Sequence, residues 1–188
     1  MGVDPYVLPE GLPVPEDDGA ADHLPGLRVR SLVLESSAGP VDLAELCAVL
    51  GVLYVYPRSG RPGEPLLPDW NEIPGARGCT PQSCGFRDHA AELRELGAEI
   101  AGLSAQGLDD QLEFAERNAM PFPVISDPAL RLRDALGLPT FTVAGLELYR
   151  RLALVAQDGV IEKVFYPVFP PDRNAADVVA WLTATVAP

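Results

Sequence analysis

Apolar residues recur along the chain in two alternating patterns, short continuous runs and helical repeats. The run VLYVYP (residues 52–57) is β-branched and aromatic and is bounded by Gly51 and Pro57, which predicts a buried strand. The runs AEIAGLSA and FPVISD predict two further strands. After Gln82 the apolar residues follow helical spacing, so a helix is expected between the first two strands; its apolar positions are Phe86, Ala90, Leu93 and Leu96.

The remaining segments continue this alternation. LDDQLEFAERNAM predicts an amphipathic helix, and PALRLRDALG predicts a short helix that starts at Pro128 and stops at Gly137. RRLALVAQDGVIEKVFYPV predicts two strands joined through Asp158-Gly159, and NAADVVAWLTATV predicts a last helix. Upstream, LRVRSLVLESSAGPVDL predicts a short hairpin. The expected fold class is therefore α/β, with a mixed central sheet flanked by helices, an N-terminal extension and a hairpin.

Two segments do not fit the alternation. Residues 1–26 form a leader rich in proline and acidic residues, ahead of one expected domain at residues 27–188. The segment from Arg58 to Gly78, about twenty residues dense in Pro and Gly, is longer than compact domains usually carry without a functional reason. Trp70 is expected to anchor this loop rather than to cover a site. The loop delivers the chain to Cys79.

Composition limits the classes of partner. The chain has 188 residues, of which 47% are hydrophobic, enough for one domain with a sizeable core. Its 14 basic and 27 acidic side chains give a formal charge of −13, which disfavours nucleic acid and anionic lipid surfaces. No apolar run approaches the roughly 20 residues that a membrane helix needs, and the N-terminus lacks a basic start with an apolar stretch. A cytoplasmic location is the expectation.

Candidate chemistry centres on two of the three cysteines. Thr80-Pro81 is a helix-start signal, with Thr80 able to cap the free amides, so Cys79 is expected at a helix N-terminus. The helix dipole there favours a thiolate, and Arg77 and Arg87 can add positive potential. Three cysteines are too few for a disulfide scaffold, so any bridge is expected to be transient.

The spacing of Cys79 and Cys84 predicts a moving part. Five residues on an α-helix correspond to about 140° of rotation and about 7.5 Å of rise, which separates the two Cα atoms by about 8 to 9 Å. A disulfide needs Cα atoms within about 7 Å. A bridge between these thiols therefore requires the first turn of the helix to unwind.

The segment GCTPQSCGFRDHAAEL resembles the active-site helix of the Q-type peroxiredoxins, also called bacterioferritin comigratory proteins. VDLAELCAVLGVLYVYP, PVISDPALRLRDALG and LVAQDGVIEKVFYPV occur in that family's order, so the resemblance covers roughly Leu27 to Val186. It implies a thioredoxin-like fold and a thiol-dependent peroxidase that needs no metal or organic cofactor. Cys79 would attack a peroxide, and Cys84 would resolve the sulfenic acid to a disulfide that thioredoxin or a similar dithiol reduces. A monomer is expected rather than a dimer.

The resemblance also implies an arginine beside the sulfur, and it exposes one departure. When LVAQDG is aligned with the family's strand and turn, Arg150 occupies the position of this arginine. A shift of one residue in the alignment would place Arg151 there instead, because neighbouring strand residues face opposite sides. Family members carry Thr or Ser three residues before the reactive cysteine and Pro four residues earlier, where this chain has Ala76 and Glu72. One positioned donor can contribute roughly 3 to 4 kcal/mol to a transition state. Thr80 or a backbone amide of the helix start could replace it.

The remaining cysteine and the two histidines allow other interpretations. Cys47 lies on an apolar stretch and is expected in the core, His89 is expected at the surface, and His23 has no evident partner. A zinc site built from Cys79, Cys84 and His89 would lack a fourth ligand. The same pair of thiols could instead serve a thiol-disulfide oxidoreductase, or a redox-sensing protein whose oxidation alters a binding surface.

Overall fold

A five-stranded mixed sheet forms the centre of the computed structural model, which describes residues 4–186. Its strands lie in the order β5-β4-β3-β8-β9; β3, β4 and β5 are parallel to one another, β8 is antiparallel to β3, and β9 is antiparallel to β8. The bounds are Leu50–Val55 for β3, Glu99–Ser104 for β4, Val124–Ser126 for β5, Leu152–Gln157 for β8 and Val160–Phe165 for β9. The mixed sheet predicted from the alternation of elements is confirmed.

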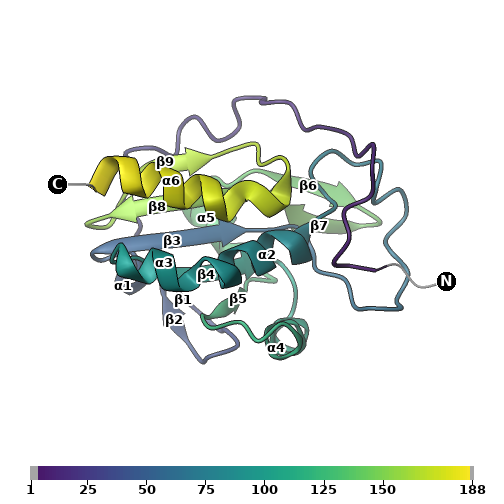
Figure 1. Ribbon diagram of the computed structural model, residues 1–188, viewed down its shortest axis with the longest axis horizontal. Helices are drawn as coiled ribbons and strands as arrows, with labels where there is room; N and C mark the ends of the chain where they lie inside the picture. The colour runs from purple at the N-terminus through teal and green to yellow at the C-terminus, as the bar shows by residue number, and fades with distance from the viewer. Residues whose placement is uncertain (1–3, 187–188) are drawn as a thin grey trace.

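Helices cover both faces of this sheet, because successive residues of the buried strands point to opposite sides. In β3, Val52 and Tyr54 pack in one apolar cluster and Leu53 and Val55 in the other. The first cluster lies under α2 (Cys79–Asp88), α3 (Ala90–Glu95) and α6 (Asn174–Val186). The second includes residues of α1 (Leu43–Leu46) and α5 (Arg131–Leu136), and α4 (Leu108–Arg117) packs beside β5 at the sheet edge (Figure 1).

Two small hairpins flank the central sheet. The predicted upstream hairpin is present, with β1 (Val33–Leu34) antiparallel to β2 (Val41–Asp42). The second, β6 (Thr140–Val143) paired with β7 (Leu146–Tyr149), was not predicted. Its turn places both Ala144 and Gly145 at positive φ, 49° and 77°. Because alanine rarely adopts that conformation, the sequence carries no recognisable turn signal here.

Three helix boundaries differ from expectation. Thr80 does not cap α2, because the helix already starts at Cys79, after Gly78 in a left-handed conformation with φ of 106°. The helix predicted to run on from Gln82 is divided at His89 into α2 and α3. The start of α5 at Pro128 was also wrong: the Asp127 carboxylate accepts the amides of Arg131 and Leu132, which fixes the first turn three residues later.

The leader and the long loop lie together at the end of the molecule where α2 begins (Figure 1). Ala21 and Leu24 of the leader are buried in the core cluster, and the His23 ring bonds to the Leu136 carbonyl oxygen at 2.9 Å. His23 thus has a partner that the sequence did not reveal. In the loop, Trp70 is buried against the apolar residues around β6 and β7, which confirms it as an anchor. No helix within residues 4–186 has the length and apolarity to span a membrane.

Candidate active site

Cys79 lies at a helix N-terminus, as predicted, although it is itself the first residue of α2, and only 3% of its surface is exposed. The first amides of an α-helix have no intrahelical acceptor, and the helix dipole adds positive potential at the same end. Pro81 carries no amide proton, so the free donors nearest the sulfur are the amides of Cys79 and Thr80. A negatively charged sulfur or oxygen is therefore favoured at this position.

The charged partner of the sulfur is Arg151, so the prediction of Arg150 was wrong. Arg151 Nη2 donates to Cys79 Sγ at 3.2 Å, and the Arg151 side chain is buried. Arg150 faces the other way, with 42% of its side chain exposed, and pairs with Asp18 at 3.4 Å. The two residues directly precede β8, where neighbours point to opposite sides, so a register error of one residue exchanged them.

Arg151 is held by acceptors on two sides. From the loop, the carbonyl oxygens of Gly75, Ala76 and Arg77 accept from its guanidinium at 3.2, 3.0 and 3.2 Å. From α2, Gln82 Oε1 accepts from Nη1 at 2.5 Å. The sequence reasoning missed Gln82, although its position three residues after Cys79 on one helix places the two side chains on neighbouring parts of the helix surface.

Ala76, which stands where family members carry a hydroxyl, packs its side chain among apolar residues of the loop and β7. It is fully buried in an apolar cluster with Trp70 and Leu148. Its carbonyl oxygen faces the site instead, accepting from Arg151 and from Cys79 Sγ at 3.6 Å. The loop therefore contributes backbone oxygens that hold the arginine, and no side-chain hydroxyl from residue 76.

Cys84 lies on the same continuous helix as Cys79, and both thiols are free. Its sulfur is partly buried and contacts Asn118 Oδ1 at 3.8 Å. Burial raises the pKa of the Cys84 thiol, although the positive charge of Arg87 opposes that shift. Since the helix is intact between the two thiols, its geometry keeps their Cα atoms about 8 to 9 Å apart.

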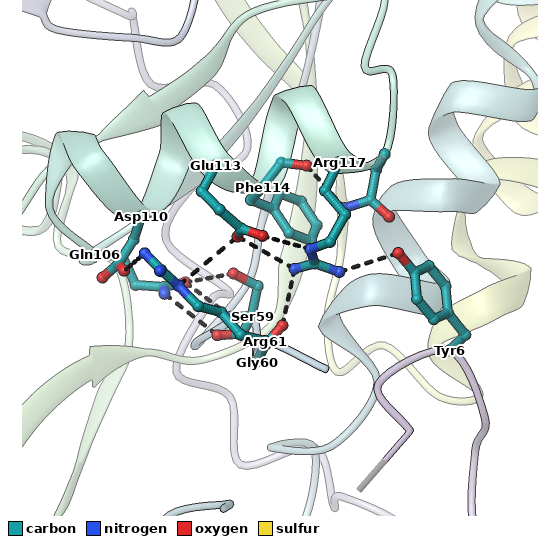
Figure 2. A network of polar contacts seen from close by, with 10 residues as sticks. Tyr6, Ser59, Gly60, Arg61, Gln106, Asp110, Glu113, Phe114 and Arg117 are labelled. Carbon is teal, nitrogen blue, oxygen red and sulfur yellow. Dashed lines mark hydrogen bonds and ion pairs between the residues drawn. The ribbon is translucent and has the colours of Figure 1, made fainter. Parts of the chain in front are cut away.

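The leader covers this region through polar contacts on both sides of α2. Arg77 Nη2 donates to the carbonyl oxygens of Asp4 and Val7 at 2.6 and 3.2 Å. Figure 2 shows a second anchor, in which Arg117 donates to the Tyr6 hydroxyl at 3.0 Å, to the Gly60 carbonyl at 3.0 Å and to Glu113 at 2.6 Å. Leader, loop and α4 are thus joined beside Asn118, the residue that contacts Cys84.

A cavity of about 420 Å³ lies next to Arg151. The leader, the loop and β6 supply apolar parts of its wall, among them Val14, Pro15, Ile73 and Phe141. Charges of both signs line it as well, from Glu16, Asp18, Arg150 and Arg151. Within residues 4–186, this cavity is lined by both Arg150 and Arg151. It gives a small molecule access to the guanidinium that contacts Cys79.

The remaining candidates lie apart from this chemistry. Cys47 is buried in the core as predicted, and burial raises the pKa of its thiol to about 11. His89 lies at the surface, as expected, and bonds to Glu92 at 2.9 Å. Within the described part of the chain, no three His, Cys, Asp or Glu side chains gather in a way that could hold a metal ion.

Comparisons with known proteins identify the family of the chain. The family model described as Redoxin matches residues 23–180. Chloroplastic peroxiredoxin Q of Sedum lineare is 27% identical over 146 residues, covering 76% of this chain and 68% of that protein. The Arabidopsis thaliana protein of the same name is 25% identical over 150 residues, covering 80% and 62%. This chain spans between 52% and 68% of the length of such curated relatives.

Solved structures are similar in fold. Peroxidoxin BcpB of Mycobacterium tuberculosis is 27% identical with a TM-score of 0.68, over 85% of this chain and 96% of that one. A bacterioferritin comigratory protein of Xanthomonas campestris, studied for alkyl peroxide reduction activity, is 21% identical with a TM-score of 0.65, over 92% and 98%. The second comparison bears on the fold alone.

Proposed function

Because this chain belongs to the Redoxin family and has the thioredoxin-like fold of its structural relatives, we propose that it is a thiol-dependent peroxidase. The observation that carries the proposal is the contact of Arg151 with Cys79 Sγ at the start of α2. A buried guanidinium and free helix amides around one thiol provide the positive potential that nucleophilic sulfur requires. The names of the curated relatives, peroxiredoxin Q, support the same activity.

In the first step, the Cys79 thiolate attacks one oxygen of the peroxide. A sulfur–oxygen bond forms as the oxygen–oxygen bond breaks, so the sulfur is oxidised to a sulfenic acid and the other oxygen leaves as water or an alcohol after taking a proton. Negative charge moves from sulfur to the leaving oxygen during this step. Arg151 and the amides of Cys79 and Thr80 stabilise that charge, because they are fixed before the reaction begins.

In the second step, the Cys84 thiolate attacks the sulfenic sulfur of Cys79. A disulfide forms and the hydroxyl leaves as water, after which a dithiol such as thioredoxin reduces the disulfide. The intact helix keeps the two Cα atoms about 8 to 9 Å apart. A disulfide spans at most about 7 Å, so the first turns of α2 unwind in this step.

The test is rapid mixing of the reduced protein with hydrogen peroxide and with an organic hydroperoxide, followed by turnover with thioredoxin and its reductase. Cys79→Ser should abolish peroxide consumption. Cys84→Ser should undergo one oxidation and then stop as a sulfenic or over-oxidised product, which mass spectrometry identifies. Oxidation of Cys79→Ser as fast as Cys84→Ser would overturn the assignment of the two roles.

A second candidate, a thiol-disulfide oxidoreductase, is favoured by one observation. Residue 76 is alanine and packs in an apolar cluster, so the hydroxyl that orients peroxide in the family is missing. A thiol-disulfide oxidoreductase would reduce a protein disulfide in the absence of peroxide and would react slowly with hydroperoxides. The nearly complete burial of Cys79 opposes this alternative, because a protein disulfide must reach the sulfur directly.

A further inference from the structure

A line of buried polar groups connects the C-terminal helix with the active sulfur. Asn174, the first residue of α6, accepts a hydrogen bond from Gln82 Nε2 at its Oδ1 atom, at 2.9 Å. Gln82 Oε1 accepts from Arg151 at 2.5 Å, and Arg151 donates to Cys79 Sγ at 3.2 Å. Asn174, Gln82 and Arg151 are exposed by 2%, 0% and 3%, so water does not compete for these contacts.

The orientation of the Gln82 side-chain amide decides whether Gln82 can accept a hydrogen bond from Arg151. An amide presents an acceptor oxygen at one end and donor hydrogens at the other, whereas a guanidinium has donors only. Gln82 can therefore hold Arg151 only with Oε1 facing it, and its NH2 group then faces Asn174. Because Asn174 offers an oxygen at that point, it favours the productive orientation; a reversed amide would set two donors against each other.

Close packing keeps Asn174 within reach of Gln82. At Gly85, one turn further along α2, a Cβ atom would lie 3.2 Å from the Asp172 carbonyl oxygen and 3.6 Å from Ala175 Cβ. The absence of a side chain at Gly85 thus lets α2 approach the start of α6. The helix that carries Cys79 and the residue that orients Gln82 are fixed against each other.

We propose that Asn174 is a positioning residue, which acts through Gln82 to hold Arg151 against the Cys79 sulfur; the inference rests on the peroxidase function proposed above. The other acceptors of Arg151 are backbone oxygens of residues 75–77, which belong to the end of the loop. Apart from the sulfur itself, Gln82 is the side-chain acceptor for Arg151 among the described contacts, and it lies on the same helix as the sulfur. Unwinding of α2 in the second step releases Gln82 from both partners, so this helix contributes to holding the arginine only while Cys79 is poised to react.

The experiment compares Asn174→Leu, which keeps the size but loses the acceptor, with Asn174→Asp, which keeps the acceptor. The readout is the second-order rate of Cys79 oxidation by hydrogen peroxide in rapid mixing. Asn174→Leu should be slower by about tenfold, less than the roughly 100-fold or more expected when a donor that touches the reacting atoms is lost. Asn174→Asp should retain the wild-type rate within about threefold, because its carboxylate also accepts from Gln82.

A Gln82→Glu background makes the test independent of general damage to the fold. A carboxylate accepts from Arg151 in either orientation and needs no partner to choose between them. Asn174→Leu should therefore slow the Gln82→Glu protein little or not at all. Val178→Ala, a buried change elsewhere on α6, is the matched control: it should lower the melting temperature without slowing oxidation.

Equal rates for wild type and Asn174→Leu would overturn the proposal, as would a full tenfold loss that persists in the Gln82→Glu background. Alkylation of Cys79 by iodoacetamide is measured in parallel, because it reports the reactivity of the thiolate without peroxide. If peroxide fails to oxidise the wild type while alkylation still slows in Asn174→Leu and recovers in Asn174→Asp, the positioning role stands and the proposed peroxidase function fails.

Discussion

Charge stabilisation at the sulfur depends on one buried guanidinium that contacts five acceptors. Lysine would keep the positive charge of Arg151, but it cannot reach the loop carbonyls, Gln82 and the sulfur at once. Arg151→Lys should slow the oxidation of Cys79 by about 100- to 1,000-fold, the range seen when one positioned donor is lost. Arg150→Lys, which changes an exposed pair with Asp18, is the control in the same rapid-mixing assay and should stay within about threefold of wild type. A larger loss in Arg150→Lys than in Arg151→Lys would reverse the assignment.

A hydroxyl restored at residue 76 should not restore the family's hydrogen bond. The side chain of Ala76 lies in the apolar cluster with Trp70 and Leu148, and only its carbonyl faces the sulfur. Ala76→Thr therefore buries an unpaired hydroxyl, which should destabilise the protein by about 1 to 3 kcal/mol in denaturant unfolding. The rate of Cys79 oxidation should not rise. Faster oxidation would mean that the loop presents residue 76 to the peroxide.

The core thiol gives a prediction on pH. Burial raises the pKa of Cys47 to about 11, because the buried site disfavours the charged thiolate. The raised pKa contributes stability below the unfolded value of 9.0, and that contribution is lost as the pH rises towards about 11. Iodoacetamide should leave Cys47 unmodified at pH 8 in the folded protein and modify it only in strongly alkaline solution or after unfolding. Peptide mapping that finds Cys47 alkylated at pH 8, as fast as in denaturant, would contradict its burial.

At the scale of the element, α2 is expected to differ in conformation between the reduced and the disulfide form. Reduced, it is an intact helix from Cys79 to Asp88; oxidised, its first turns cannot keep that form, since a disulfide cannot span about 8 to 9 Å between Cα atoms. Hydrogen exchange should show lost protection from about Cys84 to Asp88 in the disulfide form, while the amides of Val52 to Tyr56 in the central strand stay protected. Equal protection of that helical turn in both forms would argue against unwinding. A mixture of Cys79→Ser and Cys84→Ser proteins under the same oxidant is the control, because neither variant can form the internal bridge.

At the scale of the whole molecule, the leader packs against the residues that directly precede Cys79, and we expect it to restrict access to the sulfur. Arg77 binds its backbone at Asp4 and Val7, Arg117 binds Tyr6, and a Cβ at Gly78 would lie 2.9 Å from Leu8 Cδ2. Deleting residues 2–12 removes these contacts and keeps the core residues Ala21 and Leu24. A bulky maleimide should then modify Cys79 several times faster than in the full chain, with a modest fall in melting temperature. Tyr6→Phe, which loses only the hydroxyl contact, should behave like wild type; an unchanged maleimide rate after the deletion would show that the leader does not limit access.

Much of the fold follows from patterns along the chain, because a buried strand or an amphipathic helix imposes its own spacing on apolar residues. The strand predicted at residues 52–57, which the structure places at Leu50–Val55, and the helical residues after Gln82 were recognisable for that reason, whereas the turn was recognisable from Asp158-Gly159. The hairpin of β6 and β7 was missed, since a positive φ at Ala144 has no signature in composition. The position of α5 was misjudged because its start depends on the Asp127 side chain rather than on Pro128.

The sequence by itself determined the two candidate thiols, since a cysteine at a helix start and a second one five residues later are local features of one element. Only the tertiary structure decided which of two adjacent arginines reaches the sulfur, because that choice depends on the register of a strand 72 residues away. The tertiary structure also brings Asn174 into contact with Gln82, 92 positions away along the chain, and buries the side chain of Ala76 in an apolar cluster. Contacts between distant segments depend on how the faces of different elements pack together, and no local spacing along the chain specifies that.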